Sequence, residues 1–397
     1  MLLINNGTLL QPGAVAGAGR VLIDGGKIAG VGASTSVPIP PGAAVLDAAG
    51  GYVVPGFIDV HVHGGGGADF MDATPEAVRT VCRFHASGGT TGLLATTAAA
   101  PRDDLLHMLD VVAGVRREGT GGAAILGVHL EGPYFAPTRP GCHLPGEVRR
   151  PDPAEYLCLL DRHPGLVRWV TLAPELDGAM DLIAALRIRG AVAAAGHTEA
   201  DEPRLRQAIA AGLRHATHLY CAMSTIRKDG PRRIPGLVET ALAADELTTE
   251  VIADGHHLAP ALLTIAARAK GPAGLLLVTD AMRGAGMPDG TYPFGPPNGS
   301  LAIVAGGVAR TPDNTGYASS TARANELVRN MVERAGCVLV DAVRMASTTP
   351  AGALGLGRRK GRLRRGYDAD LVVLDRRLDV RATIVGGEIV YEGARSE

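Results

Sequence analysis

The chain has 397 residues, of which 46% are hydrophobic and 20% charged, proportions typical of a globular protein with room for a large domain and a smaller one. Its formal net charge of −1 and the absence of a membrane-length apolar run give no reason to expect a nucleic acid or a membrane as partner. The N-terminus "MLLINNGTLL" lacks the basic start of a secretory signal, and the five cysteines form no CxxC pair, which predicts reduced thiols in a cytoplasmic protein.

The first 55 residues contain short apolar runs separated by Gly and Pro, as in "RVLIDGGKIAGVGA". Such runs predict short strands joined by tight turns. We interpret residues 1–55 as the first part of a small β domain.

From residue 56 onward, strand-like and helix-like segments alternate. The segment "TPEAVRTVCRFHASGG" predicts a helix with Thr74 as N-cap, Pro75 at its first position and Gly88 at its end. Most of the strand segments are continuous apolar runs, typical of parallel strands buried on both faces. The predicted strands are 56–63, 89–96, 124–132, 167–175, 191–198, 214–220, 249–257 and 274–282. The predicted helices are 74–89, 101–117, 153–162, 178–189, 202–212, 235–246, 259–270 and 319–335.

Eight strand–helix units in succession predict an α/β fold of the (β/α)₈ TIM-barrel class over residues 56–345. The tail returns to short strands, in "DADLVVLDR" and "ATIVGGEIVYEG". We therefore expect residues 346–397 to pair with residues 1–55 in one small, β-sandwich-like domain beside the barrel.

Ionisable residues gather at the ends of the predicted barrel strands. His61 and His63 end the first strand, and the two side chains share one face because strand side chains repeat every two residues. Later strands end in the residues Glu131, His197, His218, His256, His257 and Asp280. The carboxyl ends of barrel strands meet at one mouth, where active sites are built. Histidines and carboxylates collected there predict a site for two divalent metals, with zinc favoured by the ligand types.

Each of these residues also has an ordinary structural explanation. An isolated HxH pair is more often a surface or core feature than a metal site. A single buried residue such as His218 is commonly a hydrogen-bonded core histidine, and Asp280 could cap a loop. The coincidence argues against these structural explanations, because six ligand-type residues at corresponding strand ends would be costly to bury without a partner. The six are His61, His63, Glu131, His197, His218 and Asp280.

At this point the chain resembles the N-acetylglucosamine-6-phosphate deacetylases of the amidohydrolase superfamily. The motifs "PGFIDVHVHG", "LEGPY", "GHTEAD", "THLYCAM", "ADGHHL" and "VTDAMR" occur in the order typical of that family, and "GRLRRGYDADLVVLD" is similar to the end of its β domain. The resemblance covers nearly the whole chain and implies a barrel of amidohydrolase type. Only "LEGP", "GHT" and "THLY" with "AM" point to the narrower family.

The resemblance implies a ligand set for the metals. Glu131, His197 and His218 match the core metal ligands, and His61 and His63 match a second metal site that some members lack. One or two divalent ions are implied, Zn²⁺ first, with Fe²⁺, Mn²⁺ or Co²⁺ as alternatives. Many relatives in the superfamily bridge two metals with a modified lysine, but none of the four lysines lies on a predicted barrel strand, which leaves Glu131 as the implied bridge.

The resemblance also implies roles in hydrolysing an N-acetyl amino sugar. Asp280 matches the catalytic carboxylate, which would take a proton from the attacking water and return it to the leaving amine. His257 matches a histidine that contacts the acyl carbonyl. His143, in "GCHLPG", matches a sugar-contacting histidine on a mobile loop, although it could be only a loop residue.

Departures from the family pattern collect where the sugar's distal end would lie. Cys221, next to Ala222, stands where relatives carry Asn in "YNAM", and "YASS" around Ser319 replaces "AGS". Arg227 and Arg233 belong to a basic segment that suits phosphate, or that forms a solvated loop. The family is implied to form homodimers in which basic residues reach the neighbouring site.

Three hypotheses follow. The first is a metal-dependent deacetylase of N-acetylglucosamine 6-phosphate. The second is a deacylase of another N-acyl amino sugar, of different stereochemistry or unphosphorylated, in a biosynthetic pathway for example. The third, from another class, is a non-catalytic scaffold, which would typically have lost metal ligands that this chain keeps.

Overall fold

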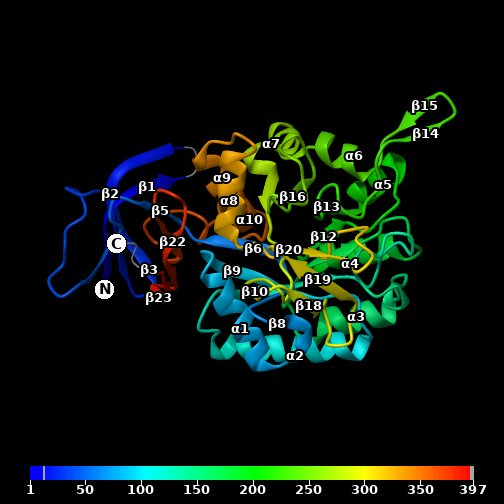
Figure 1. The fold of residues 1–397 in the computed structure, drawn as a ribbon, viewed down its shortest axis with the longest axis horizontal. Coiled ribbons are helices and arrows are strands. Elements are labelled where there is room, and N and C mark those ends of the chain that lie inside the picture. The colour runs from blue at the N-terminus through cyan, green and yellow to red at the C-terminus, as the bar shows by residue number, and fades with distance from the viewer. Residues whose placement is uncertain (12–13, 394–397) are drawn as a thin grey trace.

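The computed structural model describes residues 1–11 and 14–393, and it places a small β domain beside a large barrel (Figure 1). The barrel sheet has eight strands in the order β17-β16-β13-β12-β11-β10-β9-β6, and every pair along this order is parallel. The strands are β6 (Phe57–Val62), β9 (Thr90–Thr96), β10 (Ala124–Glu131), β11 (Val167–Leu172), β12 (Val192–Ala195), β13 (Leu213–Ala216), β16 (Thr248–Val251) and β17 (Leu275–Leu277). This confirms the predicted (β/α)₈ barrel.

Residues just after β17 close the barrel against β6. The Asp280 N–H donates to the His61 carbonyl over 2.8 Å, and the His63 N–H donates to the Ala281 carbonyl over 2.9 Å. Closure therefore brings the first and last predicted site residues into contact through the backbone itself.

Helices follow the strands as predicted. They are α1 (Pro75–Ala86), α2 (Arg102–Glu118), α3 (Pro153–Arg162), α4 (Ala179–Arg189), α5 (Glu202–Ala211), α6 (Leu237–Ala243), α7 (Pro260–Gly274) and α8 (Ala324–Glu333). Helix α1 begins as its sequence predicts, because the Thr74 side chain accepts a hydrogen bond from the Ala77 N–H and Pro75 takes the first helical position. Among the described residues, no helix has both the length and the apolar character needed to cross a membrane.

The barrel has a packed interior distinct from the layer under the helices. Ile58, Val60, Leu94 and Trp169 from neighbouring strands form the interior cluster. Helix α10 (Thr348–Ala353) contacts β6 and β17, and its Ala351 joins the same cluster. The C-terminal segment thus contributes to the barrel before it enters the small domain; the exact predicted boundary at residues 345 and 346 stays a prediction.

The small domain is a mixed sheet built from both chain ends, as predicted. Strand β5 (Tyr52–Pro55) pairs antiparallel with β21 (Leu371–Leu374), which joins the two ends. The sheet order is β23-β22-β21-β5-β1-β2-β3, and β4 (Ala44–Asp47) pairs with β1. The other strands are β1 (Leu2–Gln11), β2 (Ala14–Asp24), β3 (Lys27–Ala33), β22 (Val380–Val385) and β23 (Glu388–Glu392).

Several small elements interrupt the barrel pattern. Near its mouth lie the short pair β7 (Gly64–Gly65) and β8 (Ala68–Asp69) and the 3₁₀ turns Phe70–Asp72 and Pro145–Glu147. A hairpin of β14 (Arg227–Asp229) and β15 (Arg232–Ile234) projects from the end of the molecule far from the small domain (Figure 1). The strands β18 (Gly290–Pro293), β19 (Leu301–Ala305) and β20 (Val308–Arg310) form a separate antiparallel sheet, and helix α9 (Leu339–Ala346) follows α8.

Candidate active site and metal centre

Strand β6 carries His61 into the barrel mouth, and His63 follows directly after its last residue, Val62. All six of its residues are buried, and His61 and His63 are 0% and 1% exposed. Glu131 is the last residue of β10 and is equally buried. These three residues lie at the strand ends where the sequence predicts them.

The other three ligand-type residues lie beyond their strands, not on them. His197 follows β12, which ends at Ala195; His218 follows β13, which ends at Ala216; Asp280 follows β17. All three have left-handed backbone conformations, with φ of 50°, 26° and 47°. This conformation is uncommon for side-chain-bearing residues and often marks functional sites. The predicted strands extend too far, because the chain turns out of the sheet at these positions.

Glu131 is the centre of the cluster. Its Oε1 lies 3.2 Å from His61 Nε2, 3.3 Å from His197 Nε2 and 3.2 Å from His218 Nε2. The His197 and His218 Nε2 atoms are 3.0 Å apart. Glu131, His197 and His218, from three separate strand ends, thus meet around one point, and His61 lies beside them.

A second group adjoins the first. Glu131 Oε2 lies 3.1 Å from His63 Nε2 and 3.2 Å from His143 Nε2. Asp280 Oδ1 lies 3.2 Å from His63 Nε2 and 3.5 Å from His61 Nε2. Glu131 therefore stands between two donor groups with one oxygen turned to each.

These donor atoms fit divalent metals. A tetrahedral ion with metal–nitrogen distances of about 2.0–2.1 Å holds its ligand atoms about 3.3 Å apart, close to the spacings in both groups. Within the described chain, the buried Nε2 atoms of His61 and His63 have no hydrogen-bond partner. Buried polar nitrogens without partners are rare, and lone pairs directed at a shared cation account for them. The structure therefore supports two candidate metal-binding groups and leaves the metal's identity open.

Hydrogen bonds distinguish the rings by their tautomers. The Arg139 carbonyl must accept from His197 Nδ1 over 2.8 Å, so the Nε2 of a neutral His197 carries a lone pair. His143 is the opposite case, because its Nδ1 accepts from the Ala99 N–H over 3.0 Å and its Nε2 therefore carries the proton. His143 lies close enough to group with Glu131 and His197 as a ligand, but its tautomer makes it a hydrogen-bond donor instead.

Protonation states differ among the candidate ligands. Burial raises the pKa of Glu131, but the surrounding rings, His61 first, outweigh it and hold that pKa well below the ordinary value. The pKa of Asp280 is likewise lowered by His61 and His63 against the effect of burial. Burial lowers the pKa of His197 to about 4. Against the effect of burial, Glu131 and Asp280 raise the pKa of His61 and of His63, so each of these rings loses a proton when it ligates a metal. Ionised carboxylates and a neutral imidazole are the forms that ligate a cation.

A cavity of about 560 Å³ opens beside the cluster, a size suited to a small organic molecule. The predicted contact residues Cys221, Ala222, His143 and His257 all line it. His257 Nδ1 lies 2.8 Å from Asp254 Oδ2, and its ring packs on Tyr317 with centroids 4.5 Å apart. Other lining residues include Thr138, Arg139, Phe294, Thr311, Thr315 and Ser319.

Arg227 and Arg233 are not brought to this cavity. Both lie exposed on the β14–β15 hairpin, and Arg227 Nη2 donates to Asp201 Oδ2 over 2.9 Å. Of the arginines, Arg139 lines the cavity, and Glu199 binds its guanidinium at 2.6 and 3.2 Å. Within one chain, the two predicted arginines therefore lie away from the cavity.

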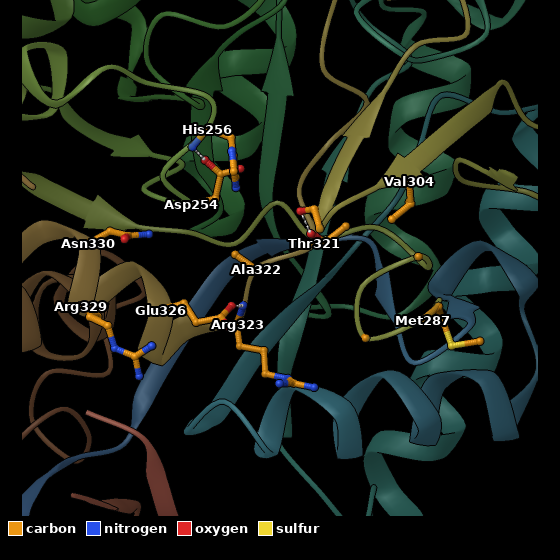
Figure 2. Close-up of a pocket in the computed structure, with 13 residues that line it drawn as sticks. Asp254, His256, Met287, Val304, Thr321, Ala322, Arg323, Glu326, Arg329 and Asn330 are labelled. Carbon is orange, nitrogen blue, oxygen red and sulfur yellow. Dashed lines mark hydrogen bonds between the residues drawn. The ribbon is translucent and has the colours of Figure 1, made fainter. Parts of the chain in front are cut away.

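A second cavity, of about 440 Å³, lies around the start of α8. Figure 2 shows its lining, with the Asp254 side chain bonded to the backbone of His256, Arg329 beside Asn330, and Met287 at the opposite end. None of the predicted ligands lines this cavity. Asp254 lines this cavity and also holds His257, which lines the first cavity.

Sequence reasoning missed Glu250 and Asp254, which hold site histidines from behind. The signal for Glu250 was its position, a single carboxylate within the buried run "TEVIA". Asp254 follows in the same segment, three residues before His257. Both residues bind a ring through Nδ1 and so fix which way that ring's Nε2 points.

Comparison with known proteins decides the family. A model of the amidohydrolase family matches residues 52–390, which is most of the chain. The chain belongs to the amidohydrolase family. Within it, the relatives place the chain among the N-acetylglucosamine-6-phosphate deacetylases. Such an enzyme from Bacillus subtilis is 38% identical over 395 residues, covering 98% of this chain and 97% of the relative.

One more relative and one solved structure are similar over most of the chain. An N-acetylgalactosamine-6-phosphate deacetylase from Escherichia coli O157:H7 is 36% identical and covers 89% of this chain and 90% of its own length. The solved N-acetyl-D-glucosamine-6-phosphate deacetylase of Mycobacterium smegmatis superposes with a TM-score of 0.88 at 39% identity, covering 98% of this chain and 99% of that one. That structure is of an aspartate-to-alanine mutant in complex with N-acetyl-D-glucosamine-6-phosphate. The fold and the family thus agree with the motifs.

Proposed function

We propose that this amidohydrolase removes the acetyl group from an N-acetyl amino sugar, and that its substrate is N-acetylglucosamine 6-phosphate. The observation that carries the proposal is the convergence of Glu131, His197 and His218 within about 3.3 Å of one another, beside the carboxylate of Asp280. The full-length similarity to deacetylases of this substrate supports the choice of sugar. The retained donor set argues against a non-catalytic scaffold.

The metal ligands divide into two positions. Glu131, His197 and His218 would hold the first ion, and His61 and His63 with Asp280 would hold a second. Zinc is the metal we expect, with Fe²⁺, Mn²⁺ or Co²⁺ as alternatives, because imidazole and carboxylate ligands suit all four. When bound, such a metal supplies Lewis-acid activation of water and of the amide carbonyl.

Asp280 is positioned to move the proton. It takes a proton from the attacking water and later gives one to the amine that leaves, acting first as base and then as acid. The Ser319 hydroxyl donates to Asp280 Oδ1 over 3.1 Å, which fixes the carboxylate at the cavity wall. Its lowered pKa keeps the carboxylate ionised, as a base must be before it accepts a proton.

Two histidines would bind the substrate. His257 lines the cavity with Nδ1 tied to Asp254, so its Nε2 edge is the one left for the acyl carbonyl oxygen. His143 carries its proton on Nε2 and donates it toward Glu131 Oε2 in this structure, which suits it to donate to a sugar hydroxyl. Cys221 and Ala222 would lie against the distal end of the sugar.

The distal phosphate would be met by a second copy of the chain. Arg227 and Arg233 stand on a hairpin that projects from the molecule (Figure 1), and neither residue lines the cavity of its own chain. We propose a homodimer in which this hairpin reaches the partner's cavity and offers guanidinium groups to the phosphate.

The cysteines support a reducing compartment. All five are free in the structure, including the exposed Cys158. Free thiols persist where glutathione and thioredoxin keep them reduced. We therefore propose that the enzyme works in the cytoplasm.

A second candidate is deacetylation of a different amino sugar. The E. coli relative named for N-acetylgalactosamine 6-phosphate is nearly as similar as the others, and Cys221 departs from the family at the distal end. The two sugars differ in one hydroxyl configuration, which a few contacts can discriminate.

A substrate panel tests both candidates. We would measure kcat/KM on N-acetylglucosamine and N-acetylgalactosamine, each with and without the 6-phosphate, and on the N-formyl analogue. The proposal predicts the highest value for N-acetylglucosamine 6-phosphate and a loss of roughly 100-fold or more without the phosphate, since charged contacts to it are removed. An unchanged kcat/KM without the phosphate, or a preference for the galactose configuration, would overturn the choice of substrate.

A further inference from the structure

Glu250 is a fully buried carboxylate directly behind the candidate metal centre. It lies on β16 and is 0% exposed. A carboxylate in such a place is costly unless hydrogen bonds satisfy its oxygens. The hydrogen-bond donors around Glu250 therefore show which residues this carboxylate holds in place.

Three donors reach Glu250, and two of them belong to predicted metal ligands. Its Oε1 lies 2.6 Å from His61 Nδ1 and accepts the His218 backbone N–H over 3.0 Å. Its Oε2 lies 3.1 Å from His215 Nε2. His215 is in turn 2.7 Å from Thr248 through its Nδ1, so it serves as a second anchor for the carboxylate.

The contact between Glu250 and His61 determines which nitrogen of the His61 ring can ligate a metal. A carboxylate accepts only, so the proton between the two groups sits on His61 Nδ1. The Nε2 of that ring faces Asp280 and Glu131, 3.5 and 3.2 Å away, and is the nitrogen left to ligate a metal. In metal sites a carboxylate behind a histidine fixes its tautomer and raises its basicity as a ligand.

The two metal positions differ in how they are supported. His197, in the first position, is fixed by a backbone carbonyl, which no side-chain substitution removes. In the second position, the ring of His61 is held by the side chain of Glu250, which reaches His218 of the first position only through the backbone N–H. We propose that Glu250 is a positioning residue that holds His61 ready to ligate, and that it thereby determines whether the second metal position is filled. This inference rests on the metal centre of the proposed function.

The experiment uses Co²⁺ alone as the probe, titrated into chelator-treated wild type, Glu250→Gln and Thr249→Val, with binding followed by calorimetry and by visible absorption. Gln keeps the shape and one acceptor oxygen but removes the charge. Thr249→Val is the matched control, since it alters the neighbouring buried residue on the same strand, whose hydroxyl bonds the Ala216 carbonyl.

We expect two Co²⁺ equivalents for the wild type and the control. In Glu250→Gln the second equivalent should bind roughly 10- to 100-fold more weakly, with the first within about threefold of wild type. Equal binding of both equivalents, or selective loss of the first, would overturn the role of Glu250 while leaving the deacetylase proposal standing. A wild type that binds no metal would overturn both.

A second measurement does not depend on the variant folding. In zinc-loaded wild type labelled with ¹⁵N-histidine, the ring nitrogen shifts of His61 should show a protonated Nδ1 and a metal-bound Nε2. A metal-bound Nδ1 would overturn the inference, because Glu250 could not then hold that proton.

Discussion

Histidines at the mouth of the barrel look alike in the sequence, yet their hydrogen-bond partners give them different chemistry. His61 and His197 donate from Nδ1 and turn Nε2, the nitrogen left to ligate a metal, to the centre. His143 receives a backbone N–H at Nδ1 and so keeps its proton on Nε2. The difference between a ligand and a donor is therefore made by one oxygen or one N–H behind the ring.

Asp280→Asn tests the proton transfer assigned to that residue. The amide keeps the shape but cannot accept the proton, so we expect kcat to fall about 10²- to 10⁴-fold while the fold persists. Metal content should remain at one equivalent or more, because the first position does not use Asp280. Steady-state kinetics with metal analysis would show this, with Asp103→Asn on exposed α2 as control. Turnover near that of wild type would remove Asp280 from the mechanism.

Cys221 should be an inert part of the cavity wall. Burial and, after it, the nearby Asp280 raise the pKa of its thiol to about 12. At pH 7.5 roughly one such thiol in 10⁴ to 10⁵ is ionised, so alkylation should be slow. Iodoacetamide on the native protein should label the exposed Cys158 and spare Cys221, and Cys221→Ser should keep kcat within about threefold. Rapid, inactivating labelling of Cys221 would contradict this.

The sequence carried enough information to predict the candidate ligands, but not the groups that hold their rings in place. His61, His63 and Glu131 were predictable because they interrupt apolar strands at the ends that meet in a barrel mouth. Glu250 also interrupts a strand, but nothing local shows that its partner is a residue 189 positions away. The tautomers likewise depend on backbone groups such as the Ala99 N–H, which no side-chain pattern records.

At the scale of elements, the candidate site residues lie at or just past the ends of the barrel strands. His197, His218 and Asp280 leave their strands in left-handed conformations, and the turn directs each side chain inward. Strand propensity extends past these points in the sequence, so the predicted strands extend too far. The antiparallel sheet of β18–β20 was also missed, because its short strands fall where the barrel pattern suggests a loop.

A cluster of ion pairs joins the two halves of the small domain. Asp368 lies 2.5 Å from Lys27, 2.8 Å from Arg359 and 3.0 Å from Lys360. Burial raises the pKa of this carboxyl, but these cations outweigh it and lower the pKa from 3.8 to about 2. The pair with Lys27 is the one that links the N-terminal strands to the C-terminal segment.

Asp368→Asn should therefore lower stability in a pH-dependent way. A depressed folded-state pKa contributes stability above the unfolded value near 4, and the contribution is lost as pH falls toward 2. Because the group is partly screened by solvent, we expect a loss of about 1 kcal/mol at neutral pH. The difference from wild type, measured by denaturant unfolding, should be constant from pH 7 to pH 5 and about half as large at pH 3. A difference that grows on acidification would contradict the assignment.

At the scale of the molecule, the barrel and the small domain are one connected structure. The chain starts in the small sheet, completes the barrel, inserts Ala351 into the barrel interior and returns to pair β21 with β5. Both this architecture and the pairing of the two ends were predictable, because periodicity and punctuation repeat over hundreds of residues. The homodimer stays a prediction, because the structure describes one chain.

Mixing two inactive variants tests whether the hairpin arginines act across a dimer. One variant is Asp280→Asn, and the other carries Arg227→Ala with Arg233→Ala. A mixed dimer would combine an intact centre in one copy with intact arginines from the other, so activity should recover toward that of one site per dimer. If each arginine served its own chain, no mixed dimer would have a competent site and mixing would recover nothing.

The proposed hydrolysis requires that Glu131, His197 and His218 ligate the same metal ion. Anomalous diffraction from crystals of the zinc-loaded enzyme, recorded on both sides of the zinc absorption edge, tests it directly. We predict a zinc peak about 2.0–2.2 Å from Glu131 Oε1 and from the Nε2 atoms of both histidines. A peak elsewhere, or none beside these three residues, would contradict the metal centre and the hydrolysis derived from it.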